Sequence, residues 1–159
     1  MSALFEIRPA VESDRRALAE LFAAVAEERD GIASEPPVDV AARAAAWRLD
    51  GEFVAEARDG LVGQLHVDRT SHGYGEIGML VARDWRGRGV GSALMAAAID
   101  WARAEGLHKL SLAVFAHNEA GLALYRKFGF VEEGRRVEHI RRASGEHWDL
   151  VEMGLLLGR

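Results

Sequence analysis

The chain has 159 residues, a formal net charge of −5 and no cysteine. This length suits one domain, residues 1–159, with a hydrophobic core that needs neither disulfides nor bound metal. The lack of cysteine excludes disulfide bonds, thiolate catalysis and cysteine-ligated metal. The acidic balance argues against non-specific binding of nucleic acid, and no stretch resembles a membrane span or a signal peptide. We therefore expect a cytoplasmic protein without a nucleic-acid or membrane partner.

The first half of the chain predicts one strand, two helices and then an antiparallel hairpin. Apolar residues recur either with the two-residue period of strands or with the spacing of one helix face. In chain order, these elements are expected at residues 4–8 (strand), 13–28 and 40–50 (helices), and 53–57 and 61–67 (strands). Ser13 is suited to cap the first helix. Asp59-Gly60 separates the last two strands, and an Asp-Gly pair at this place favours a tight hairpin.

The second half alternates strands with helices and ends in two further strands. Strands are expected at residues 76–81, 109–115, 131–140 and 147–157, and a helix at residues 90–105. Asn118 is suited to cap a second helix, which Gly129 would end. The order β-α-α-β-β-β-α-β-α-β-β predicts an α/β fold, with a mixed antiparallel and parallel sheet of about seven strands and about four helices.

A basic, glycine-rich turn joins the strand at residues 76–81 to the helix that follows. Gly87, Gly89 and Gly91 stand at alternate positions, where they allow backbone conformations closed to other residues and a close approach of a ligand. Arg86 and Arg88 add positive charge. Because the turn lies at a helix N-terminus, its free N–H groups favour an anion. The turn therefore predicts a ligand that carries phosphate.

Two common phosphate motifs do not fit this turn. A dinucleotide fingerprint, G-x-G-x-x-G, would need a third glycine where Ser92 or Leu94 stands. A P-loop would need Gly-Lys followed by Ser or Thr, which is absent from the sequence. Both nucleotide-binding interpretations therefore fail on spacing.

The pattern that does fit is Arg-x-x-Gly-x-Gly, at Arg86, Gly89 and Gly91. Downstream, residues 118–130 read Asn-x-x-Ala-x-x-Leu-Tyr-x-x-x-Gly-Phe, except that Gly121 stands where alanine is usual. With these two motifs and its element order, the chain resembles the GNAT family of N-acetyltransferases over nearly its whole length. The resemblance implies the GNAT acyl-CoA N-acyltransferase fold, acetyl-CoA as co-substrate, and transfer of the acetyl group to a primary amine by direct attack.

The resemblance also implies which residues bind acetyl-CoA. Backbone N–H groups of the turn would hold the pyrophosphate, and the preceding strand would run beside the pantetheine arm. These candidates are Met79, Leu80, Val81, Arg86, Gly87, Arg88, Gly89, Val90, Gly91 and Ser92. An N–H group near the end of that strand could also stabilise the tetrahedral oxyanion. Asn118 is a further candidate, although an asparagine here can equally serve as a helix cap alone.

Acetyl transfer needs a base for the amine and an acid for the departing thiolate. Family members often place a tyrosine where Tyr125 stands to protonate the thiolate, and some carry a base in the place of Glu76. Tyr125 would otherwise be a packed core residue, and Glu76 a solvated carboxylate. His66, His72 and His117 are rival bases because histidine titrates near neutrality. No histidine pair has the spacing of a metal site, so we expect no metal.

The acceptor amine is not defined by these motifs, although a small molecule is favoured over a protein. Its pocket is expected to be built by the segments at residues 29–37, 70–75 and 140–146. Family members are often dimers, so a homodimer is considered as well. The alternative function is a non-catalytic, acyl-CoA-binding module that regulates a partner protein.

Overall fold

The computed structural model describes residues 4–158, which contain seven strands, four α-helices and two short 3₁₀ turns. The strands are β1 (Phe5–Pro9), β2 (Glu52–Ala57), β3 (Gly60–Arg69), β4 (Tyr74–Val81), β5 (Lys109–Phe115), β6 (Val131–Arg141) and β7 (His147–Leu156). The helices are α1 (Arg15–Glu27), α2 (Val40–Ala46), α3 (Val90–Ala104) and α4 (Glu119–Lys127), and the 3₁₀ turns are η1 (Glu12–Asp14) and η2 (Arg83–Trp85). The element order predicted from the sequence is confirmed.

All seven strands form one mixed sheet in the order β1-β2-β3-β4-β5-β7-β6. Neighbouring strands are antiparallel except β4 and β5, which are parallel. The predicted α/β fold with a mixed sheet is therefore confirmed.

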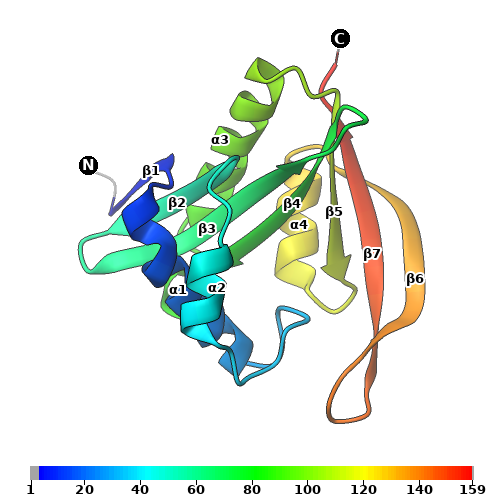
Figure 1. The fold of residues 1–159 in the computed structure, drawn as a ribbon. Coiled ribbons are helices and arrows are strands. Elements are labelled where there is room, and N and C mark those ends of the chain that lie inside the picture. Colours follow the sequence, from blue (N-terminus) through cyan, green and yellow to red (C-terminus); the bar gives the residue numbers. More distant parts are fainter. Residues whose placement is uncertain (1–3, 159) are drawn as a thin grey trace.

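The helices cover the two faces of the sheet in separate pairs (Figure 1). On one face, Leu21 and Val25 of α1 pack against Leu80 of β4, and α2 lies beside α1. On the other face, α3 and α4 enclose the larger core, in which Leu65 and Leu94 are fully buried. None of the helices in residues 4–158 is long and apolar enough to cross a membrane.

The parallel strands β4 and β5 separate along their length. Their register pairs only residues 74–76 with residues 109–111, although β4 continues to Val81 and β5 to Phe115. On the other side of β4, the N–H group of Ala82 donates to the carbonyl of Val62 at 2.8 Å. Because hydrogen-bonded pairs alternate along antiparallel strands, the backbone groups of Met79 and Val81 point away from β3. The separation thus leaves a gap lined by free backbone groups of β4.

The two N-terminal helices differ from the predicted ones. Ser13 does not cap α1; instead the Asp14 carboxylate accepts bonds from Arg8 at 2.7 and 2.9 Å and from the Val11 N–H at 2.8 Å, which fixes η1 ahead of the helix. The predicted helix at residues 40–50 ends at Ala46. Its C-cap Trp47 is extended, and Arg15 donates to the Trp47 carbonyl.

Candidate active site

The glycine-rich turn forms an open cradle at the start of α3. Gly87 and Gly89 adopt left-handed φ angles of 74° and 87°. A methyl group built on either glycine would meet no atom of residues 4–158 within 4 Å. Because α3 begins at Val90, the N–H groups of Val90, Gly91 and Ser92 have no helical acceptor. Free donors above an open glycine floor, at the positive end of a helix, fit a pyrophosphate group.

This cradle is one end of a cavity of about 560 Å³, a size typical of cofactor sites. The cavity continues along β4 and past the start of α4. Its lining includes ten of the predicted cofactor residues, namely Met79, Leu80, Val81, Arg86, Gly87, Gly89, Val90, Gly91, Ser92 and Asn118. Arg88 is outside the lining, and its guanidinium lies 4.9 Å from the Trp85 ring centroid. We call this the cofactor cavity.

The side chain of Arg86 supports the cradle from outside the helix. Its guanidinium forms two hydrogen bonds with the Glu28 carboxylate, at 2.7 and 2.8 Å, and Nε donates to the Val81 carbonyl at 3.0 Å. Arg86 therefore fastens the turn to the ends of α1 and β4, and a carboxylate already pairs its charge. Lys127, which sequence reasoning missed, donates to the Ser92 hydroxyl at 3.2 Å and brings another positive charge beside the cradle.

A second cavity of about 490 Å³ lies between the sheet and the α1–α2 side of the molecule. Glu52, Gln64 and His66 line its sheet side, and Phe22 and Trp47 line the opposite side. We call this the acceptor cavity.

The two cavities meet around the residues that line both of them. These are Gly31, Ile32, Met79, Leu80, Asn118 and Tyr125. A group held in the cofactor cavity and a group held in the acceptor cavity would come into contact at this junction.

Tyr125 stands at the junction and is only 9% exposed. Its ring packs edge-on against Phe130, with 6.0 Å between the ring centroids. Burial raises the pKa of the Tyr125 hydroxyl to about 12, so the hydroxyl keeps its proton at neutral pH. Tyr125 is thus both a packed core residue and a proton donor in reach of both cavities; its catalytic role stays a prediction.

Asn118 caps α4, because its Oδ1 accepts a hydrogen bond from the Gly121 N–H at 2.9 Å. A Cβ atom on Gly121 would lie 2.7 Å from the Asn118 side-chain nitrogen. The departure from the family pattern at position 121 therefore leaves room for the Asn118 amide. Since Asn118 also lines both cavities, capping and ligand contact are compatible.

The structure does not bring Glu76 to the junction. Glu76 is exposed, pairs in register with Asp68 and lines neither cavity. Among the rival histidines, His66 lines the acceptor cavity, and His117 lines the cofactor cavity with its Nε2 3.3 Å from Asp30 Oδ1. His72 is exposed and lines neither cavity.

His66 is held by the side chain of Gln64, whose Nε2 lies 3.0 Å from Nδ1 of the imidazole. An amide nitrogen only donates, so this Nδ1 accepts and the ring proton resides on Nε2. Burial lowers the pKa of His66, against a smaller raising effect of the Asp68 charge. His66 is therefore neutral at pH 7. Within residues 4–158, no three His, Asp or Glu side chains form a group that could hold a metal ion.

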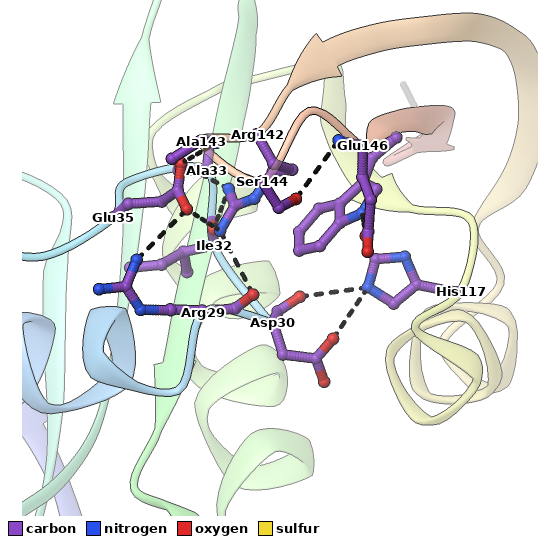
Figure 2. Close-up of polar contacts among 11 residues, drawn as sticks. Arg29, Asp30, Ile32, Ala33, Glu35, His117, Arg142, Ala143, Ser144 and Glu146 are labelled. Carbon is purple, nitrogen blue, oxygen red and sulfur yellow. Dashed lines mark hydrogen bonds and ion pairs between the residues drawn. The ribbon is translucent and has the colours of Figure 1, made fainter.

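A loop between α1 and α2, residues 29–35, covers the junction, and we call it the roof loop. Its Gly31 and Ile32 line both cavities. Figure 2 shows how the β6–β7 hairpin fastens it: Arg142 donates to the carbonyls of Arg29, Ile32 and Ala33, at 3.3, 3.1 and 2.8 Å.

Further contacts close this fastening. The Glu35 carboxylate accepts a hydrogen bond from the Ala143 N–H at 2.9 Å (Figure 2). His117, just before α4, has its Nε2 3.2 Å from the Asp30 carbonyl oxygen. The Arg142 guanidinium also stacks 4.0 Å from the Trp148 ring centroid. Of the three segments expected to build the acceptor pocket, only residues 29–37 line the acceptor cavity, through Gly31, Ile32 and Ala33. Residues 140–146 hold that loop without lining the cavity, and residues 70–75 do not line it. The contacts between residues 29–37 and 140–146 join residues more than 100 apart in the chain, so they could not be predicted from the sequence alone.

Comparisons with known proteins agree with this fold. The sequence profile of the Acetyltransferase (GNAT) family matches residues 16–130. An L-methionine sulfoximine/L-methionine sulfone acetyltransferase of Pseudomonas paraeruginosa is 30% identical over 168 residues, which covers 95% of this chain and 94% of that protein. The chain therefore belongs to the GNAT family of acetyltransferases.

Solved structures give the same result. A ribosomal-protein-alanine N-acetyltransferase from Brucella melitensis is 31% identical, with a TM-score of 0.84 over 95% of this chain and 99% of that one. A phosphinothricin acetyltransferase from Sinorhizobium meliloti, solved in complex with acetyl-CoA, shares the fold at 22% identity, with a TM-score of 0.86 over 98% and 90%. The predicted acetyl-CoA-dependent N-acetyltransferase is confirmed, and the non-catalytic alternative is not carried further.

Proposed function

We propose that this N-acetyltransferase acts on the primary amine of a small molecule, with amino acids and related amines as the first acceptors to test. The observation that carries the proposal is the junction of the two cavities at Met79, Leu80 and Tyr125. An acceptor cavity of about 490 Å³ under a fastened loop suits a small molecule. The relative from P. paraeruginosa supports this class, since its named acceptors are amino-acid derivatives.

In the proposed reaction the amine attacks the thioester carbonyl of acetyl-CoA, a carbon–nitrogen bond forms, and the carbon–sulfur bond breaks. The cradle N–H groups anchor the pyrophosphate, and the backbone groups of Met79, with the N–H group of Val81, hold the arm beside β4. An N–H group in this gap also stabilises the oxyanion. Tyr125, which burial keeps protonated, donates its proton to the departing thiolate.

The base that receives the amine proton is a separate part of the proposal. Glu76 lines neither cavity but is on the face of β4 that also carries Gly78, which lines the acceptor cavity, so it would act through water. His66 is the rival because it lines the cavity, but its Nδ1 accepts from Gln64. A fall in kcat of about 100-fold in Glu76→Gln, with a much smaller fall in His66→Asn, supports Glu76 as the base. The reverse result assigns the base to His66.

The function is tested by incubating the purified chain with acetyl-CoA and a panel of amino acids, diamines and short peptides, while thiol release is followed. We expect release above the amine-free rate with at least one small amine. Release with peptides alone would contradict the small-molecule proposal. If acetyl-CoA binds but no amine of the panel raises thiol release above the amine-free rate, the proposed function itself would be contradicted.

We also propose a cytoplasmic protein that does not bind nucleic acid. The net charge of −5 and the absence of cysteine support this assignment. A homodimer is proposed from the family habit alone, and light scattering of the purified chain measures its mass in solution.

A further inference from the structure

One buried carboxylate in the acceptor cavity has no part in the reaction as proposed. Glu52, the first residue of β2, is 3% exposed and lines the cavity. Its Oε1 finds no hydrogen-bond partner among the described residues. Buried polar atoms in folded proteins nearly always have a partner, and a buried polar atom without one costs free energy. An unpartnered carboxylate oxygen inside a cavity therefore points to a donor that arrives with a ligand.

The sheet register places Glu52 at the end of the cavity away from the transfer junction. Glu52 stands opposite His66 on β3, and His66 stands opposite Gly78 on β4. Side chains that stand directly opposite each other share one face of the sheet. Since neighbouring strands are about 4.8 Å apart, Glu52 lies roughly 10 Å from the β4 backbone. One molecule can therefore span from the junction, beside Met79 and Leu80, to Glu52.

Glycine makes this row of residues possible. A Cβ atom on Gly78 would overlap the imidazole of His66, so the ring lies over the β4 backbone at this point. The ring is neutral, and it fills the floor of the cavity between the junction and Glu52. Nothing on this floor repels a positively charged ligand.

The remaining charged groups around the far end are already engaged or exposed. Asp50 is paired with Arg69 at 3.0 Å, and Asp68 is 3.7 Å from His66. On the α2 side, the Arg43 guanidinium stacks 3.5 Å from the Phe22 ring centroid, and Arg48 is exposed, where solvent screens its charge. The aromatic side chain of Trp47 completes the wall. Glu52 is thus the buried group at this end that a ligand would satisfy.

We propose that Glu52 forms a subsite for a second positively charged nitrogen, so that the preferred acceptor carries two amino groups separated by a chain of several atoms. Such an acceptor is a basic amino acid or an aliphatic diamine. This inference rests on the proposed acetylation of a small amine and names the class of that acceptor. One nitrogen would be acetylated at the junction, while the other, as an ammonium or guanidinium group, donates to the Glu52 carboxylate.

The ionisation of Glu52 agrees with this role. Burial raises the pKa of Glu52 to about 8, only partly offset by the side chains of Trp47 and Gln64, so the free enzyme holds this carboxyl mostly protonated at pH 7. A cation beside it favours the ionised form. Binding of the second nitrogen should therefore release the Glu52 proton.

The first test compares acceptors in matched pairs that differ only in the distal charge: lysine with norleucine, ornithine with norvaline, and 1,5-diaminopentane with pentylamine. We expect kcat/KM to be at least about tenfold higher for the member with the distal charge, and Glu52→Gln to bring the ratio of kcat/KM within each pair close to one. Asp68→Asn, at a carboxylate that is 54% exposed, is the matched control and should keep the preference. Comparing the amino-acid pairs with the diamine pair shows whether the enzyme prefers a basic amino acid or an aliphatic diamine.

The second test needs no turnover. Calorimetry of acceptor binding to the CoA complex at pH 7, in two buffers of different ionisation enthalpy, should show lysine releasing up to about 0.9 proton more than norleucine, since a group with a pKa of about 8 is that fraction protonated. Glu52→Gln should abolish the difference, and an unchanged affinity of the variant for acetyl-CoA verifies its fold. If the members without the distal charge were acetylated with the same kcat/KM as their partners, the subsite would be overturned and the proposed function would stand. Charge-selective binding without acetylation of any amine would do the opposite.

Discussion

The guanidinium of Arg142 donates to the carbonyl of Ala33 at 2.8 Å and joins two segments that lie 109 residues apart in the chain. The side chain of Arg142 is 2% exposed, and its other donors go to the neighbouring carbonyls of Arg29 and Ile32. The β6–β7 hairpin thus holds the roof loop, which lies between α1 and α2. Because that loop covers the junction of the two cavities, Arg142 is a positioning residue for the site.

Replacing this guanidinium should loosen the roof loop. Arg142→Met removes the buried guanidinium that donates to three part-buried carbonyls, which should lower the free energy of unfolding by about 2 kcal/mol. The KM for the acceptor should rise about tenfold, with a smaller change in kcat, since the loop orients ligands rather than reacting.

Arg141→Met, at the exposed neighbouring position, is the matched control and should change neither quantity. Urea unfolding and steady-state kinetics on both variants measure the effect. If Arg142→Met lost stability but kept the acceptor KM of the wild type, Arg142 would be structural only.

Removing the Tyr125 hydroxyl should slow the reaction without weakening cofactor binding. Tyr125→Phe keeps the packing against Phe130 and removes the proton donor, so kcat should fall about 100-fold. Because the hydroxyl has a pKa of about 12, the wild-type rate should show no basic limb from Tyr125 below about pH 11. Pre-steady-state kinetics and acetyl-CoA titration separate the two effects, and unchanged turnover from pH 6 to pH 10 in the variant would remove the acid role.

Glu52 should make the stability of the free enzyme depend on pH. Its pKa is raised from 4.5 to about 8 on folding, so between these pH values the folded state keeps a proton that the unfolded state releases. The stabilising contribution of the protonated carboxyl is present in full below pH 4.5 and is lost as the pH rises toward 8. Relative to Glu52→Gln, the wild type should therefore lose about 3 kcal/mol between pH 5 and pH 8. Parallel curves of unfolding free energy against pH would contradict the buried carboxyl.

The cradle should depend on the left-handed conformation of Gly89. Gly89→Ala places a Cβ at a φ of 87°, which costs roughly 1–2 kcal/mol and fills the open floor of the anion site. The KM for acetyl-CoA should rise at least about tenfold.

Gly106, at the other end of α3 with a φ of 78°, provides the comparison. Gly106→Ala should lose a similar amount of stability and keep the acetyl-CoA KM of the wild type. Equal effects of the two substitutions on KM would mean that Gly89 serves the fold alone.

Features set by neighbours in sequence could be predicted. The run from β4 through the glycine turn into α3, and the Asn118 cap followed by Tyr125, depend on spacing within a few residues. These patterns indicated the mixed sheet, the cofactor and the cavity that Tyr125 lines. Element boundaries near Ser13 and Asp50 were wrong because tertiary contacts of Arg8 and Arg15 decide them.

Features set by distant contacts could not be predicted. The ion pair between Arg86 and Glu28 joins residues 58 apart in the chain. The sequence predicted that the charge of Arg86 binds phosphate, whereas in the structure it pairs with a carboxylate. Glu52, His66 and Gly78 come together only through the register of three strands. Glu76 carried the family position of a base, yet it lines neither cavity, because the lining depends on where β4 and β5 separate.

Acetyl transfer to a small amine should take place at the junction beside Tyr125. Mass spectrometry of the acceptor, after incubation with acetyl-CoA and either wild type or Tyr125→Phe, measures this transfer. We predict one acetyl group on an amino nitrogen of lysine, ornithine or a diamine, formed about 100-fold more slowly by the variant. Acetyl-CoA bound and left intact beside every amine of the panel would contradict the claim.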